Sequence, residues 1–125
     1  MKLTQIRDML LRLDTHHKIR FILLFGSVAK KTNTKLSDID IAVFYEGNAR
    51  ERVEFRIKAC GALPDMVDVQ IFQDLPLYVQ TEVLAGQLLY CTNRKKLMDT
   101  AFKVIADYED FEPIYQHYIN TGAAA

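Results

Sequence analysis

The 125-residue sequence has no excess of either charge, because 16 lysines and arginines balance 16 aspartates and glutamates. A nucleic-acid-binding domain usually carries a clustered basic surplus, so the composition gives no sign of direct nucleic-acid binding. No apolar run reaches the roughly 18 residues that a membrane-spanning helix needs. Arg7, Asp8 and Arg12 interrupt the N-terminal segment, which is not the pattern of a signal peptide. These absences predict a cytoplasmic protein with no membrane partner.

Cysteine is also scarce, and Cys60 and Cys91 stand alone without the spacing of a metal site. Reduced thiols are therefore the expected state. Half of the residues are hydrophobic, which is enough for one modest core. Since the chain shows no internal repeat and no low-complexity linker, we expect a single domain over 1–125. Residues of about 1–92 would form its core, and those of about 93–119 a C-terminal helical segment.

Apolar periodicity divides the chain into alternating helices and strands, which indicates an α/β (α+β) fold. Strands are expected over 19–25, 38–45, 66–72 and 87–91, and helices over 3–13, 49–59 and 74–86. In the helix over 49–59, Val53, Ile57 and Cys60 are expected to point inward. The longest helical pattern begins after Thr92 or Asn93 as a cap. Pro113 is expected to kink or split that helix.

Gly26 and Ser27 follow the first apolar run directly. Glycine allows a close approach of backbone to a ligand and a positive φ, and Ser27 adds a hydroxyl donor. A short helical turn after them would offer free N–H groups and a dipole that favour a phosphate. Lys30 and Lys31 would add positive charge nearby. The alternative is an ordinary strand-to-helix turn.

Asp38 and Asp40 open the second apolar run, two residues apart. On a strand this spacing places both carboxylates on one face, while Ile39 and Ile41 point to the other. Two such charges about 4 Å apart repel by about 4 kcal/mol at an effective dielectric near 20. A shared cation, a nearby basic side chain or a raised pKa would compensate. Oxygen ligands suit Mg²⁺, which also binds substrate phosphates. The alternative is a capping turn at Ser37 with solvated acids.

Together the two features resemble the signature of the DNA polymerase beta nucleotidyltransferase superfamily, especially its minimal single-domain members. Gly-Ser ends one strand, and Asp-x-Asp opens the next strand after a gap of ten residues between Ser27 and Asp38. The resemblance implies a small mixed β-sheet of about four strands with helices packed mainly on one face. It also implies that Gly26 and Ser27 bind the nucleotide and that Asp38 and Asp40 hold two Mg²⁺ ions. Lys30 is added to the predicted nucleotide-binding residues for its nearby positive charge.

The loop after Gly-Ser departs from the family's pattern, which often carries glycine or arginine where Lys30-Lys31-Thr32 stands here. Lysine supplies a point charge without the bidentate fork of arginine, so the geometry of phosphate binding can differ.

The family also uses a third acid on a later strand. Asp68, flanked by Val67 and Val69, is the match, and Asp65 just before that run is the alternative. A carboxylate within an apolar strand is costly unless it is paired or bound to metal, which favours Asp68. The predicted catalytic residues and metal ligands are therefore Asp38, Asp40 and Asp68.

The C-terminal segment resembles the ending of the nucleotidyltransferase antitoxins whose partner is a HEPN ribonuclease toxin. A basic run at Arg94–Lys96, a Tyr-x-Asp-Phe-x-Pro pattern from Tyr108 and further aromatic residues carry this likeness. It implies transfer of AMP from ATP to a tyrosine of the toxin, which silences it. The basic run is either solvated or contacts ATP or an acidic partner. Tyr108, Tyr115 and Tyr118 belong either to the core or to a partner surface.

Two other functions compete with this hypothesis. One is a non-catalytic binding module that occludes its partner, although the presence of all three acids argues against it. The other is an adenylyltransferase for a small molecule, such as an aminoglycoside-like hydroxyl compound.

Overall fold

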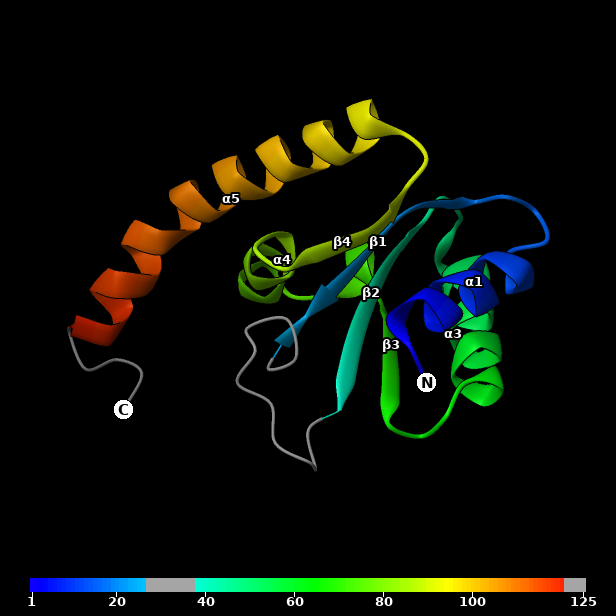
Figure 1. Cartoon of the computed structure of the whole chain (residues 1–125). Coiled ribbons are helices and arrows are strands. Elements are labelled where there is room, and N and C mark those ends of the chain that lie inside the picture. Colours follow the sequence, from blue (N-terminus) through cyan, green and yellow to red (C-terminus); the bar gives the residue numbers. More distant parts are fainter. Residues whose placement is uncertain (27–37, 121–125) are drawn as a thin grey trace.

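The computed structural model of the chain describes residues 1–26 and 38–120, the last ten of these by their backbone only. A single mixed sheet lies between helices (Figure 1). The elements in chain order are α1 (Leu3–Leu13), β1 (Ile19–Phe25), β2 (Ile39–Tyr45), α3 (Ala49–Ala62), β3 (Val67–Ile71), the 3₁₀ turn η1 (Phe72–Asp74), α4 (Leu77–Leu84), β4 (Gln87–Cys91) and α5 (Arg94–Asn120).

The four strands lie in the order β3-β2-β1-β4. Strand β1 runs antiparallel to both of its neighbours, whereas β2 and β3 are parallel. The parallel pair is connected through α3, as a parallel connection requires a crossover. The predicted fold class, a small mixed sheet of four strands with helices, is confirmed. The expectation that the helices pack mainly on one face is wrong, because α1 and α3 cover one face of the sheet and α4 and α5 cover the other.

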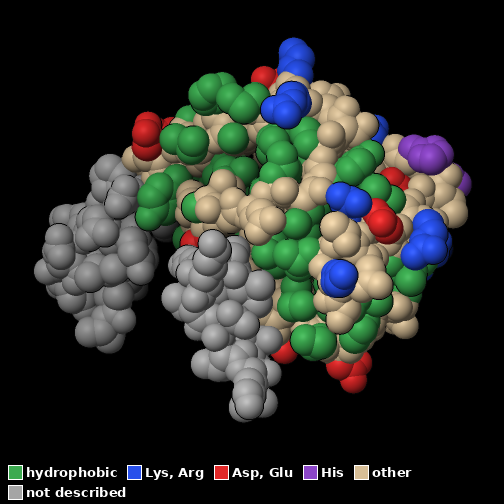
Figure 2. All heavy atoms as spheres, in the orientation of Figure 1, with side chains coloured by type: hydrophobic (Ala, Val, Ile, Leu, Met, Phe, Trp, Pro, Cys, Tyr) green, Lys and Arg blue, Asp and Glu red, His purple; other side chains and the backbone are tan. Residues whose placement is uncertain are grey.

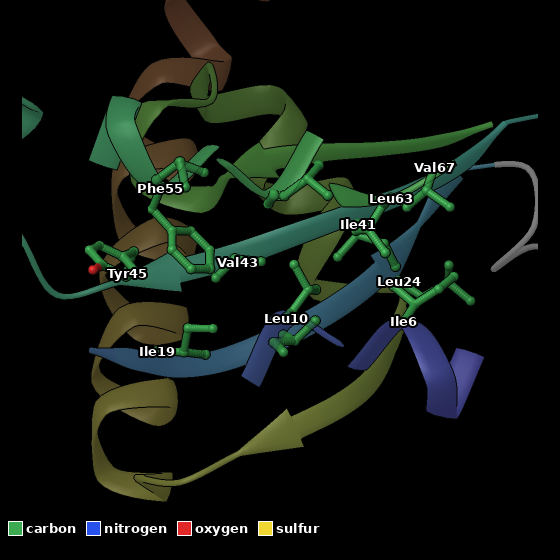
Figure 3. Close-up of a cluster of buried hydrophobic side chains, with 14 residues drawn as sticks. Ile6, Leu10, Ile19, Leu24, Ile41, Val43, Tyr45, Phe55, Leu63 and Val67 are labelled. Atoms are coloured by element: carbon green, nitrogen blue, oxygen red, sulfur yellow. The ribbon is translucent and has the colours of Figure 1, made fainter. Parts of the chain in front are cut away.

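The larger core lies between the sheet and the helices α1 and α3 (Figure 3). Alternation along each strand sends every second side chain to this face, so Ile41 and Val43 of β2 enter it. Ile6 and Leu10 pack there from α1, and Phe55 packs there from α3. On the opposite face α4 and the first half of α5 cover a smaller cluster. Its buried members are Phe21, Leu23, Ala42, Phe44, Phe72, Val83 and Val104.

The orientation expected for α3 is wrong. Val53 and Ile57 are 54% and 67% exposed, and Cys60 is also exposed. Phe55 and Ala59 face the sheet instead, and the ring of Phe55 stacks on Tyr45 with centroids 4.6 Å apart. The aromatic ring buries more apolar area than a valine or an isoleucine, so it decides which face turns inward. The helix also continues through Gly61 to Ala62.

Pro113 is expected to kink or to split the C-terminal helical segment, and it does not split it, because α5 is one helix from Arg94 to Asn120. Proline removes a single backbone donor, which a helix of this length can lose without ending. The N-terminal cap is Asn93, whose Oδ1 accepts a hydrogen bond from the backbone N–H of Lys96 at 3.0 Å.

None of the helices in the described ranges combines the length and the apolar character needed to cross a membrane.

Asp14 joins the end of α1 to the start of β1. Its side chain is almost completely buried. One carboxylate oxygen accepts from the backbone N–H of Lys18 at 2.9 Å, and the other accepts from that of Ile19 at 2.8 Å. The carboxylate therefore satisfies two donors at the point where the chain enters the sheet.

We expect Asp14→Ala to lower the free energy of unfolding by about 2–4 kcal/mol, because two backbone donors lose their partner. Urea unfolding monitored by circular dichroism measures this change. The control is Asp8→Ala, which removes an exposed carboxylate that pairs with the adjacent Arg7. Its effect should stay within about 0.5 kcal/mol. Equal losses in the two variants would contradict the role given to Asp14.

Candidate active site

The end of β1 and the beginnings of β2 and β3 meet at the same edge of the sheet. Phe25 of β1 pairs with Asp40 of β2, and Asp40 pairs in turn with Asp68 of β3. Because β1 is antiparallel to β2, Gly26 comes directly after the residue that faces Asp40. Three of the predicted site residues, from separate parts of the chain, are thus neighbours.

Gly26 lies close against the carboxylate of Asp40. Its φ is +79°, in the left-handed region that favours glycine. A Cβ atom built at this position would lie 2.3 Å from Oδ2 of Asp40. The positive φ therefore favours glycine, and a Cβ at this position would also displace the carboxylate of Asp40. Because glycine has no Cβ, the backbone of this turn lies directly against that carboxylate.

The three predicted acids influence each other electrostatically. Asp40 and Asp68 are half-buried, and Asp38 is exposed immediately before β2. Burial raises the pKa of Asp40 above its ordinary value, and the negative charges of Asp68 and then Asp38 raise it further. Of the lysines and arginines within residues 1–26 and 38–110, none forms an ion pair with these acids. The edge of the sheet therefore carries negative charge that these residues do not neutralise.

Gln70 is a further polar residue at this edge. Its side-chain Nε2 donates to both carboxylate oxygens of Asp68, at 3.1 Å each. Sequence reasoning missed this residue. The signal was the Val-Asp-Val-Gln-Ile pattern, in which two polar residues share one face of an otherwise apolar strand.

The donor set suits a hard divalent cation such as Mg²⁺, which prefers carboxylate oxygens. Among the residues that the structure describes, no three His, Cys, Asp or Glu side chains already form a closed metal-binding group. Burial first, and then the negative charges of Asp68 and Asp38, raise the pKa of Asp40, and a shared cation would offset the repulsion among these carboxylates. Asp65, the alternative third acid, is exposed before β3, and it is Asp68 that pairs with Asp40. Ser27 and Lys30 lie outside the described residues.

Residues 9–95 match the family model described as polymerase beta, nucleotidyltransferase. The chain belongs to this family. It is therefore a nucleotidyltransferase, an enzyme of the class that the motif resembles. A candidate protein adenylyltransferase of Methanocaldococcus jannaschii, MJ1547, is 33% identical over 95 residues, which are 76% of this chain and 74% of that protein.

Solved structures with this nucleotidyltransferase fold cover almost the whole chain. The crystal structure of a toxin–antitoxin with AMP-PNP has a TM-score of 0.76 at 27% identity, over 98% of this chain and 99% of the other. The structure of a tri-AMPylated Shewanella oneidensis HEPN toxin in complex with its MNT antitoxin has a TM-score of 0.70 over 97% and 99%. Its identity of 23% makes this second likeness one of fold alone.

The nucleotidyltransferase places its C-terminal basic run away from the acids. Lys96 lies 5.1 Å from the centroid of the Phe44 ring and 3.7 Å from Glu46, at the far end of β2. Lys95 pairs with Asp99 on α5 itself. Lys96 thus helps to hold α5 against the end of β2, and Lys95 forms an ion pair on the surface of α5. Tyr108 is half-buried, whereas the side chains of Tyr115 and Tyr118 lie outside the described residues.

The outer face of α5 carries exposed apolar side chains. Met98, Phe102 and Ile105 follow one another by four and three residues and are 51%, 64% and 48% exposed. Figure 2 shows hydrophobic side chains gathered over this helix. Leu97 and Val104, each one residue before a member of this stripe, belong to the core on a neighbouring face of the helix. The helix therefore uses one face for the core and leaves an apolar stripe beside that face.

Proposed function

We propose that this nucleotidyltransferase is a Mg²⁺-dependent protein adenylyltransferase that transfers AMP from ATP to a tyrosine hydroxyl of a HEPN-type toxin and so acts as its antitoxin. The observation that carries the proposal is the meeting of Gly26, Asp40 and Asp68 at one edge of the sheet. The solved toxin–antitoxin with AMP-PNP, an ATP analogue, supports the choice of nucleotide and partner. The likeness to MJ1547 supports protein adenylylation.

In this proposal the predicted residues divide into those that bind the triphosphate and those that hold the metal ions. Gly26 presents backbone to the triphosphate without a side chain in the way, and Ser27 and Lys30 add a donor and a charge. Asp38, Asp40 and Asp68 would hold two Mg²⁺ ions, which stabilise charge on the attacking and leaving oxygens when bound. Asp68 orients the incoming hydroxyl and accepts its proton. The hydroxyl oxygen bonds to the α-phosphorus, the bond to the β-phosphate oxygen breaks, and pyrophosphate leaves.

The acceptor is assigned to a partner protein because of the surface of α5. This long helix continues after the family match over 9–95. The exposed stripe of Met98, Phe102 and Ile105 on that helix supports contact with another protein. Exposed apolar patches of this kind are typical of interaction sites.

Transfer of the α-phosphate distinguishes adenylylation from other reactions of ATP. The protein is incubated with Mg²⁺, the product of an adjacent toxin gene, and ATP labelled on either the α- or the γ-phosphate. We expect label on the toxin from α-labelled ATP alone, a mass increase of one AMP for each modified tyrosine, and no transfer in EDTA. Toxin neutralised without label would instead indicate occlusion. Label that reaches an aminoglycoside but never the toxin would indicate a small-molecule acceptor.

A further inference from the structure

Gln70 holds the carboxylate of Asp68 in a defined orientation. One amide nitrogen lies 3.1 Å from each of the two carboxylate oxygens, so it sits symmetrically between them. Both side chains are half-buried on the same face of β3. Partial burial limits the water that could compete for this carboxylate, which makes the contact a stable one.

The register of β2 and β3 places this contact next to Asp40. Gln70 stands opposite Ala42 of β2, and Asp68 stands opposite Asp40. The alanine methyl takes little space, so the longer glutamine side chain can fold back along the strand toward Asp68. Without such a donor, Asp68 would be free to turn away from the like charge of Asp40.

A carboxylate offers about four lone-pair positions. The amide uses one on each oxygen and leaves the others for a cation or a hydroxyl proton. Hydrogen-bonded partners of metal-binding side chains usually fix the orientation of those side chains, and their loss costs about 10–100-fold in metal affinity or activity.

We propose that Gln70 is a positioning residue that directs the carboxylate of Asp68 toward the metal and acceptor positions. This inference rests on the proposed function, because it assigns Asp68 to that site. Gln70 itself touches neither the nucleotide nor the acceptor; it acts through Asp68.

The test replaces Gln70 by methionine, which has similar length and no donor. The matched control is Gln80→Met, because the Gln80 amide donates to the backbone carbonyl of Phe72 at 3.0 Å, away from the acids. Mn²⁺ affinity is measured by electron paramagnetic resonance on the full chain, and kcat and KM for ATP are measured separately. We expect Gln70→Met to lose about tenfold in Mn²⁺ affinity and in kcat, with KM for ATP changed by less than about twofold. Gln80→Met should keep all three values.

Gln70→Ala serves as a second variant, since the smaller side chain fits the same space and the same losses are expected. Unchanged Mn²⁺ affinity and kcat in a folded Gln70 variant overturn the inference while the proposed function stands. Tighter Mn²⁺ binding also overturns it, because the amide would then compete with the metal. A wild-type protein that binds no Mn²⁺ overturns both proposals together.

Discussion

Replacing Asp40 by asparagine should abolish AMP transfer, by about a thousandfold or more, and should make the protein more stable at neutral pH. Asparagine has the same size but carries no charge, so the site loses the carboxylate that lies between Gly26 and Asp68. Removing an electrostatic element of this kind typically costs about 10²–10³ in kcat, and if Asp40 holds both Mg²⁺ ions as proposed, its loss should cost more. Label transfer from α-labelled ATP measures the first effect.

The gain in stability follows from the raised pKa of Asp40. When the folded pKa lies above the unfolded one, the ionised carboxylate disfavours folding at every pH above the folded pKa, and this cost disappears as the pH falls below both values. Like charges on adjacent strands cost about 0.2–1 kcal/mol, which corresponds to an increase in Tm of about 1–4 °C. Asp40→Asn should therefore melt higher than wild type at pH 7.5 and at nearly the same temperature at pH 3.5. Scanning calorimetry without Mg²⁺ measures both.

Asp65→Asn is the matched control, because Asp65 is exposed before β3 and is not opposite Asp40. It should keep transfer and show no rise in Tm. The Asp40→Asn variant should still bind the toxin, because the apolar stripe of Met98, Phe102 and Ile105 on α5 is unchanged in the variant. If Asp40→Asn neutralises the toxin fully without labelling it, the protein acts by occlusion and the adenylyltransferase proposal is wrong.

Gly86→Ala should be strongly destabilising, by about 2–4 kcal/mol and about 10 °C in Tm. A Cβ at this position would lie 2.1 Å from the carbonyl oxygen of Leu24 and 3.1 Å from that of Val83. Both are backbone atoms, so the clash can be relieved only by moving β1 or the end of α4. Urea unfolding gives the change in free energy.

Gly61→Ala provides the control, because nothing lies within 4 Å of the position where its Cβ would stand. Gly61 is within α3, where alanine is the better helix former, so this variant should gain about 0.5–1 kcal/mol. Because Leu24 lies two residues before Gly26, Gly86→Ala should also reduce AMP transfer in the fraction that folds. Two glycine variants of equal stability would show that Gly86 is not constrained by β1.

The strands could be predicted from the sequence because their apolar residues form short runs, nearly continuous in β1 and alternating with polar residues in β3. Strands β1 and β4 have the expected bounds, and β2 ends at Tyr45 as expected. In β1 and β2 such runs reflect burial, whereas β4 has the expected bounds although its side chains are exposed or half-buried. The inward face of α3 could not be predicted in the same way, since apolar side chains occur all around that helix. The contact of Phe55 with Tyr45 of β2 decides it.

For the candidate site, too, some residues could be predicted from the sequence and others only from the structure. Gly26, Asp38 and Asp40 could be singled out because they are close in sequence and their residue types suit phosphate and metal. That Asp68 and not Asp65 lies opposite Asp40 depends on the parallel register of β2 and β3. The contact of Gln70 with Asp68 depends on side-chain geometry that a pattern of two polar residues only suggests.

The amino-acid sequence by itself determined which segments enter the sheet and singled out Gly26, Asp38 and Asp40 as candidate site residues, because burial and charge are properties of residue type and spacing. Only the tertiary structure decided which strands are neighbours, which residue stands opposite Asp40, and why Gly86 must lack a side chain. Those features arise where segments distant in sequence come into contact, and such contacts are set by register and packing.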